Sequence, residues 1–289
     1  MIKMYITIIQ PILLYGSDVW GNTKGGGECI DKVCLFFLRC ILKVRKSTSK
    51  LMVYGELGVI PPNILANISN IIFHIRLKSL PKDDIVCQLY NDLLMLDDNG
   101  FDILKTSDCY NIDVSSCLFN DRCVKNIKNV VKSFYHLKWQ EKVFNSCSSS
   151  NSSLRLYKEF KSCFSLDPYL LCVDNDKHRH ALSRFRCSSH MLEIEKARHN
   201  SKLKPIWERV CPHCKHAVDD ELHILLYCKT NEKLRTDFLS SIEHSIPNIV
   251  TMHHMDKFRS IMSSLDKLVL RNLAKFIYQS FEIRKQLTH

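Results

Sequence analysis

The chain has 289 residues, 45% of them hydrophobic and 25% charged, so it can bury the core of one large or two to three small globular units. Its 41 lysines and arginines exceed its 30 acidic residues by 11, which favours a polyanionic partner such as nucleic acid. The apolar run from Ile6 to Tyr15 is too short to span a bilayer and has no small-residue cleavage site, which argues against a membrane or secreted protein. Since the fourteen cysteines are scattered, we expect reduced thiols in an intracellular protein.

The distribution of glycine favours a helical protein. All eight glycines lie within the first hundred residues, and residues 101–289 contain none. Tight hairpin turns and phosphate-binding loops depend on glycine, so both are disfavoured over the rest of the chain. We therefore predict an all-α fold, in which an N-terminal helical unit is followed by a helical connector, a small zinc knuckle and a C-terminal helix.

Residues 1–78 are predicted to form a compact unit of three helices. An apolar segment covers residues 5–20, and apolar side chains recur at helical spacing from Ile30 to Ile41. A proline suits the first turn of a helix, so Pro61 and Pro62 predict the start of the third helix, which continues to Lys78.

Residues 79–176 are predicted to form a helical connector. Helices are expected over residues 86–96 and 124–144, with a polar stretch between them. The serine-rich run 146–153 has the composition of a flexible linker, and a further helix is expected over 154–164.

Residues 177–232 are expected to combine a basic helix with a metal-binding knuckle. Nine lysines and arginines against three glutamates give residues 177–209 a net charge of +6, more than half of the excess of the chain. Such a run can be an ordinary solvated face, but its position beside the knuckle favours nucleic-acid binding through phosphate contacts, with little sequence preference. The residues from which we expect these contacts are Arg184, Arg186, His190, Arg198, Lys202 and Lys204.

The knuckle has the spacing C-x2-C-x8-H-x4-C, with Cys211, Cys214, His223 and Cys228 as candidate ligands. Two thiolates separated by two residues can hold one ion from a single turn, and a complete set of four sulfur and nitrogen ligands is typical of a structural Zn²⁺ site. Four protein ligands leave no position for a reactive water, so we expect structural Zn²⁺ as the cofactor.

The spacing between the last two ligands sets a condition on the local structure. Asp219, Asp220 and Glu221 suit the first turn of a short helix, which then contains His223. In a regular helix Cys228, five residues later, is rotated by about 140° from His223. We therefore expect the helix to end or to distort before Cys228.

The last segment, residues 233–289, is predicted to contain a long amphipathic helix, because apolar residues recur at helical spacing from Phe258 to Phe281. No catalytic residue is predicted anywhere in the chain. The aspartate pairs at 83–84, 97–98 and 219–220 lack the strand–turn–strand frame of polymerase carboxylates, and no nucleophile motif is present.

Several motifs resemble, in order, the region downstream of the polymerase core in non-LTR (LINE-type) retrotransposon reverse transcriptases. Residues 11–21 (PILLYGSDVWG) resemble the segment that opens the thumb of that family, and 53–58 (VYGELG) resemble its next block. Residues 182–195 resemble the basic helix before the CCHC knuckle of the family, 218–228 match the second half of that knuckle, and 276–284 resemble its closing helix. The resemblance implies a thumb-like unit at 1–78 and a fragment without palm, fingers or endonuclease.

From this resemblance we expect a fragment that binds RNA or DNA but has no polymerase or endonuclease activity of its own. Two alternatives stay open at this point. The zinc and the helices could build a protein-interaction module, with a partner on the thumb face that a missing palm leaves exposed. The chain could also be a non-functional relic of an element.

Overall fold

The computed structural model describes residues 2–20, 26–96, 103–114, 116–145, 152–198 and 204–287. About 66% of the chain is helical, and the described ranges contain no strand, only the isolated bridges Leu57–Leu166 and Val210–Val218. The predicted all-α fold is therefore confirmed. None of the described helices is long and apolar enough to cross a membrane.

The internal contacts divide the chain into two compact units. Unit 1 contains residues 1–41 and 59–139, and unit 2 contains residues 42–58 and 140–289. The short segment 42–58 thus packs with residues that follow it by about a hundred positions or more, as in the bridge between Leu57 and Leu166. The division into four segments that the sequence suggests stays a prediction, and most of the serine-rich linker (146–151) lies outside the described residues.

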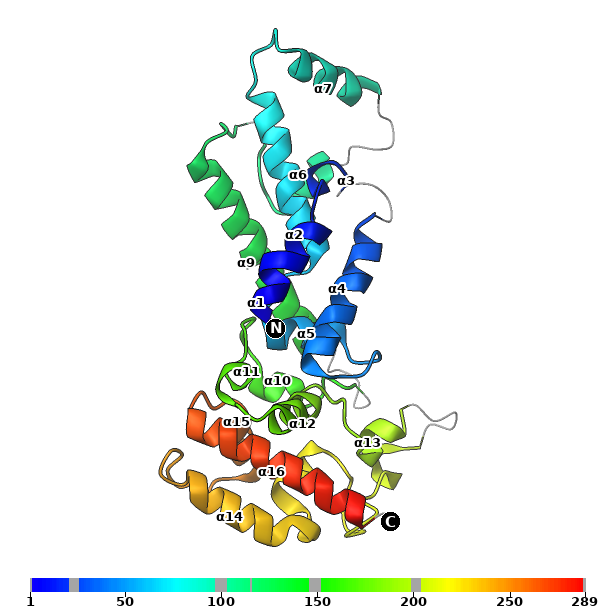
Figure 1. Cartoon of the computed structure of the whole chain (residues 1–289), viewed down its shortest axis with the longest axis vertical. Helices are drawn as coiled ribbons and strands as arrows, with labels where there is room; N and C mark the ends of the chain where they lie inside the picture. The colour runs from blue at the N-terminus through cyan, green and yellow to red at the C-terminus, as the bar shows by residue number, and fades with distance from the viewer. Residues whose placement is uncertain are drawn as a thin grey trace. The chain divides into compact units, whose positions relative to one another are not determined.

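Unit 1 is built on two long helices, α6 (Pro62–Lys78) and α9 (Asp121–Asn145) (Figure 1). Ile68, Ile71 and Ile75 of α6 belong to one buried cluster with Ile127 and Val131 of α9, because their three- and four-residue spacing places them on one face of each helix. The remaining described helices of the unit are α1 (Ile2–Met4), η1 (Tyr5–Ile9), α2 (Gln10–Leu13), α3 (Ser17–Trp20), α4 (Gly26–Leu42), α7 (Ile85–Leu96) and α8 (Ile103–Asp108).

Unit 2 is organised around the C-terminal helix α16 (Lys267–Gln286), which packs against α12 (Asp176–Arg186) and α14 (Glu232–Ile242) (Figure 1). Val269, Leu273 and Ile277 of α16 are completely buried. The other described elements of the unit are short: α5 (Lys50–Leu57), α10 (Tyr157–Phe160), α11 (Tyr169–Cys172), α13 (Glu193–Lys196), η2 (Ile206–Glu208), η3 (His223–Tyr227), η4 (Lys229–Asn231) and α15 (His254–Met262).

A buried ion cluster lies at the centre of unit 2. The guanidinium of Arg186 bonds the carboxylates of Glu56 at 2.8 Å and Asp167 at 2.5 Å, and it donates to the carbonyl of Met262 at 2.6 Å. The ring of Phe160 lies 4.7 Å from the same guanidinium. Burial acts to lower the pKa of Arg186, but the two carboxylates outweigh it and raise the pKa, so the side chain stays charged.

Two helices predicted from the sequence are shorter than expected. The helix predicted over 154–164 is reduced to Tyr157–Phe160. The single C-terminal helix is in fact two helices, α15 and α16, because the chain leaves the helical path after Met262. The side chain of Asp266 then accepts hydrogen bonds from the amides of Leu268 and Val269 and caps the start of α16.

Candidate metal centre

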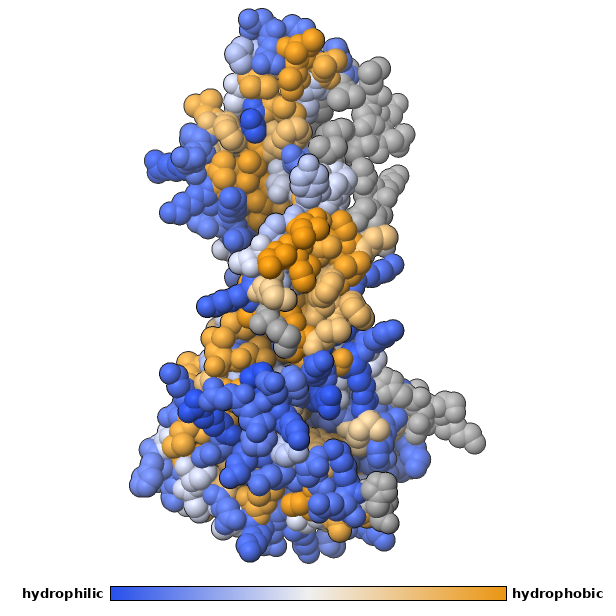
Figure 2. Space-filling view, in the orientation of Figure 1, coloured by the Kyte–Doolittle hydropathy of each residue, from blue (hydrophilic) through white to orange (hydrophobic). Residues whose placement is uncertain are grey.

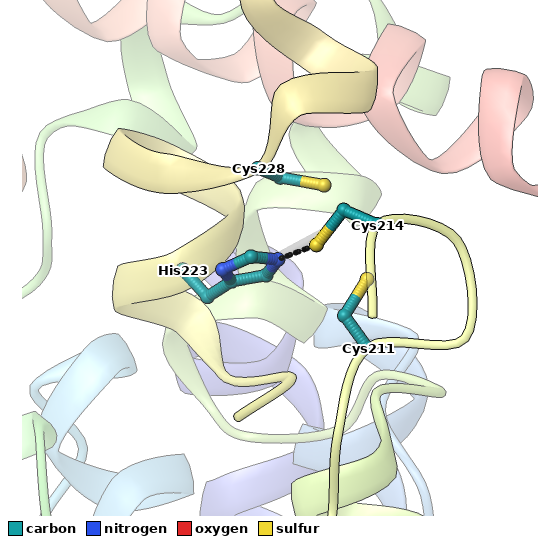
Figure 3. Close-up of side chains that lie close together, drawn as sticks. All are labelled: Cys211, Cys214, His223 and Cys228. Carbon is teal, nitrogen blue, oxygen red and sulfur yellow. Dashed lines mark hydrogen bonds between the residues drawn. The ribbon is translucent and has the colours of Figure 1, made fainter. Parts of the chain in front are cut away.

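The first two candidate ligands lie on a tight loop. Its base is held by the bridge between Val210 and Val218 and by a 2.9 Å hydrogen bond from the amide of Cys211 to the carbonyl of Ala217. The amide of Lys215 closes the turn by donating a hydrogen bond to the carbonyl of Cys211, and the φ of Lys215, 57°, lies in the left-handed region. This backbone directs the thiols of Cys211 and Cys214 to the same side of the loop (Figure 3).

The other two ligands lie at the two ends of a π-helical turn. Residues His223–Tyr227 form this turn, and the amide of Cys228 donates to the carbonyl of His223 at 2.8 Å, five residues back. A π turn contains more residues than an α turn, so it reduces the rotation that separates His223 from Cys228. The distortion expected from the H-x4-C spacing is therefore present, and it is a π turn that ends in extended backbone at Cys228.

The four side chains converge on one point (Figure 3). Their ligand atoms all lie within 4.8 Å of one another, which is close enough to hold a metal ion. The Sγ of Cys214 lies 3.3 Å from the Nε2 of His223, near the separation of about 3.5 Å that tetrahedral Zn–S and Zn–N bonds give. Cys211, His223 and Cys228 are buried and Cys214 is half-buried, so the set fits a small tetrahedral cation.

The thiols of Cys211 and Cys228 influence the pKa values of each other. The hydrogen bond from Cys228 lowers the pKa of Cys211, and the same bond raises the pKa of Cys228. Each thiol must lose its proton to act as a ligand, which makes metal binding dependent on pH.

The C-terminal helix supplies a cation beside the ligands. Arg284 of α16 bonds both carboxylate oxygens of Asp219, at 2.7 and 2.9 Å, and its Nη1 lies 3.5 Å from the Sγ of Cys211. Three thiolates and a divalent ion would carry a net charge of −1. The guanidinium would place a donor beside one of these thiolates, while Asp219 balances its own charge. Asp219 is fully buried, so this pair also fixes α16 against the knuckle.

The acidic residues before His223 each have a separate structural role. Asp220 caps the short helix, since its Oδ1 accepts the amide of His223 at 2.8 Å. Glu221 accepts a 2.8 Å hydrogen bond from the Nε2 of His190. Burial acts to raise the pKa of Glu221, but His190 and Arg155 outweigh it and lower the pKa to about 2.

The structure corrects the expected set of phosphate-binding residues. α12 ends at Arg186, because Ser188 adopts φ 47° and the amide of Ser189 bonds the carbonyl of Arg184, a helix-ending pattern that usually requires glycine. Arg186 and His190 therefore lie in the interior, 2% and 3% exposed, and are not placed to contact phosphate.

The remaining cations of the predicted set differ in exposure. Arg198 is half-buried and bonded to Glu195 and to the carbonyl of Ser152. Arg184 and Lys204 are exposed, although the Nε of Arg184 donates to the carbonyl of Lys43. Lys202 lies outside the described residues.

One surface residue was missed by sequence reasoning. Trp207 lies in the short helix η2, three residues before the bridge residue Val210 at the base of the knuckle, and is 74% exposed. The sequence could have indicated this residue, because Trp207 is an aromatic residue within the basic segment 177–209. Sites on which bases stack combine aromatic and cationic side chains. Among the aspartate pairs considered for catalysis, Asp219 and Asp220 are engaged as described above, and Asp97 and Asp98 lie outside the described residues.

In comparisons with known proteins, no protein-family model, no curated protein and no solved structure matches this chain. The resemblance to non-LTR reverse transcriptases therefore stays a hypothesis based on the motifs of the sequence.

Proposed function

We propose that unit 2 is a zinc-stabilised nucleic-acid-binding module without catalytic activity, from a protein related to non-LTR reverse transcriptases. The observation that carries the proposal is the convergence of Cys211, Cys214, His223 and Cys228, in a unit that also exposes several cations and a tryptophan. Nucleic acid is the polyanion that best suits a chain with a net charge of +11.

Zinc is the metal that this ligand set favours. Three thiolates and one imidazole are soft or borderline ligands, and tetrahedral sites of this composition are typical of structural zinc. When bound, zinc supplies folding free energy, on the order of 10 kcal/mol for small zinc modules. Because all four positions are taken by the protein, the proposed role of the metal is structural.

The proposed binding surface combines phosphate contacts with base stacking. Lys177, Arg184 and Lys204 are exposed cations that can neutralise phosphates, which gives affinity with little sequence preference. Trp207 presents an open ring on which a base of RNA or single-stranded DNA can stack, a contact of about 1–3 kcal/mol.

The first test measures the metal content of the purified chain. We expect one zinc per chain and less than about a fifth of that after Cys211→Ser, because three ligands bind zinc much more weakly than four. Cys163→Ser is the matched control, since Cys163 is free and exposed. Equal zinc content in both variants would refute the metal site.

The second test titrates zinc-loaded protein with single-stranded RNA, single-stranded DNA and duplex DNA at several salt concentrations. Stacking of a base on Trp207 should quench tryptophan fluorescence, and this quenching should be absent in Trp207→Leu. Trp139 is 1% exposed, so it cannot stack with a base. With about three phosphates neutralised, log affinity falls with log salt at a slope of roughly −2 to −3. Salt-independent binding, or none, would refute the function.

A protein-interaction module is the second candidate, because unit 1 exposes several large apolar side chains. Ile6, Ile8 and Ile12 are 48%, 54% and 69% exposed, and Figure 2 shows an apolar patch over the N-terminal helices. Exposed patches of this kind mark interaction sites or promote aggregation. Folded protein that binds zinc but no nucleic acid would favour this candidate, and a chain that binds neither would favour a relic.

A further inference from the structure

A cationic ridge runs along the outer face of α9 in unit 1, far in sequence from the zinc knuckle. Arg122, Lys125, Lys128 and Lys132 are exposed, and at 100° per residue they fall within about 120° of the helix circumference. Ile127 and Val131 lie on the opposite side, in the buried cluster of unit 1. The ridge is therefore the solvent face of an amphipathic helix, and Figure 2 shows hydrophilic side chains gathered along this part of α9.

The charges of the ridge are not used within unit 1. In the described part of the chain, none of the four cations forms an ion pair, and Asp121 is the one carboxylate that α9 places on this face. Three arginines of unit 2 differ, since Arg155, Arg186 and Arg284 each pair with a carboxylate. Unpaired cations in a row keep their full charge available for an external polyanion.

A hollow lies at the first turns of α9, where the ridge begins. It has a volume of about 600 Å³ and is open to solvent. Arg122 and Lys125 line it together with the amides of Asn126 and Asn129, which are exposed. Phe119, just before the helix, is 42% exposed. In complexes with single-stranded nucleic acid, cations contact the phosphates and carboxamides contact the sugar or the edge of a base. An exposed aromatic ring stacks on the face of a base.

We infer that this face of α9 is a second nucleic-acid-binding site, which takes single-stranded RNA or DNA and does not depend on zinc. Arg122 and Lys132 are ten residues apart, so the ridge is about 15 Å long, enough for phosphates of several successive nucleotides. An acidic peptide would satisfy the cations but would leave the carboxamides and the phenyl ring without their matching groups. The inference goes beyond the proposed function, which concerns unit 2 alone.

The test removes the ridge from the full-length, zinc-loaded chain. Lys125→Ala/Lys128→Ala/Lys132→Ala removes three charges from the ridge, and Lys82→Ala/Lys142→Ala/Lys233→Ala removes three exposed charges from elsewhere. On a single strand, each lost phosphate contact reduces the salt slope by about 0.7. Raising the salt from 50 to 200 mM should therefore weaken the affinity of wild type for a 30-nucleotide single strand about 20-fold more than it weakens that of the ridge variant. The control variant should keep the wild-type slope.

Lysine acetylation with and without the oligonucleotide gives an independent readout. We expect Lys125, Lys128 and Lys132 to be protected by the oligonucleotide, in wild type and in Cys211→Ser alike. Equal slopes for the ridge and control variants, no protection, or equal protection by polyglutamate would overturn the inference. If Trp207→Leu weakens binding and the ridge variant does not, only the proposed function of unit 2 is supported. If the ridge variant weakens binding and Trp207→Leu does not, only the ridge site is supported.

Discussion

Arg186 shows how burial changes the meaning of a basic residue. Its guanidinium is surrounded by Glu56, Asp167 and the carbonyl of Met262, so it neutralises interior carboxylates instead of phosphates. Two residues earlier on the same helix, Arg184 is exposed. Two arginines of one basic run thus differ in environment, since Arg186 neutralises interior carboxylates and Arg184 is open to solvent.

Replacing Arg186 is expected to unfold unit 2 partly or completely. Arg186→Ala removes the ion-pair partner of the buried Glu56 carboxylate and leaves Asp167 paired with Lys161 alone. Breaking a buried ion pair in this way costs about 3–5 kcal/mol. Urea unfolding measures the loss. Arg184→Ala is the matched control and should change stability by less than about 0.5 kcal/mol. Equal stability of the two variants would contradict the buried ion cluster.

His74 of unit 1 predicts a pH dependence of stability. The imidazole ring is 1% exposed and is hydrogen-bonded to the hydroxyl of Tyr90. Burial, together with the positive charge of Lys78, lowers the pKa of His74 to about 4. Between pH 4 and 6.5 the unfolded state therefore binds a proton that the folded state does not, so this contribution to stability is present above pH 6.5 and is lost as the pH falls.

The size of this effect can be measured with His74→Gln. From pH 7 to 5 the wild type should lose up to about 2 kcal/mol through His74, and His74→Gln should lose correspondingly less. Urea unfolding at the two pH values gives the difference. His244→Gln, at an exposed position, should retain the wild-type pH dependence. A pH dependence unchanged by His74→Gln would contradict a neutral buried histidine.

At the scale of elements, the metal centre depends on helices outside the knuckle. The loop and the π turn supply the ligands, but α16 supplies Arg284, which bonds Asp219 and lies against the sulfur of Cys211. Mutation of a group that hydrogen-bonds to a metal ligand commonly lowers metal affinity by about 10- to 100-fold. The sequence motif alone is therefore only part of the site.

Arg284→Met is expected to weaken zinc binding about 10- to 100-fold, because it leaves the thiolate charge and the buried Asp219 without a partner. Competition with a chromophoric chelator measures the change. The neighbouring Lys285 is 70% exposed, so Lys285→Met should have no effect. Unchanged affinity in Arg284→Met would show that α16 only covers the knuckle.

At the scale of the whole molecule, the two units are expected to respond differently to loss of the metal. Chelation should increase amide hydrogen exchange in residues 204–242 and around Arg186, since both belong to unit 2. The cluster of Ile71, Ile127 and Val131 belongs to unit 1 and should keep its protection. Loss of protection in both units would contradict two independent cores.

Several features could be predicted from the sequence because they depend on residues close together in the chain. The helices α6, α7 and α9 follow from local apolar periodicity. The ligand set follows from spacing, and the required distortion follows from the rotation between His223 and Cys228. These are properties of one helix or one turn, and distant residues change them little.

The features that the sequence could not supply depend on contacts between distant segments. Glu56 and Arg186 are 130 positions apart, and Asp219 and Arg284 are 65 apart. No local pattern distinguishes a buried arginine from an exposed one, because burial is decided by which elements pack around it. The end of α12 at Arg186 was missed for a related reason, since Ser188 takes the left-handed position that glycine usually occupies. Composition and spacing thus determined the helical class and the set of four Cys and His side chains that converge, and tertiary packing alone decided which of the cations face solvent.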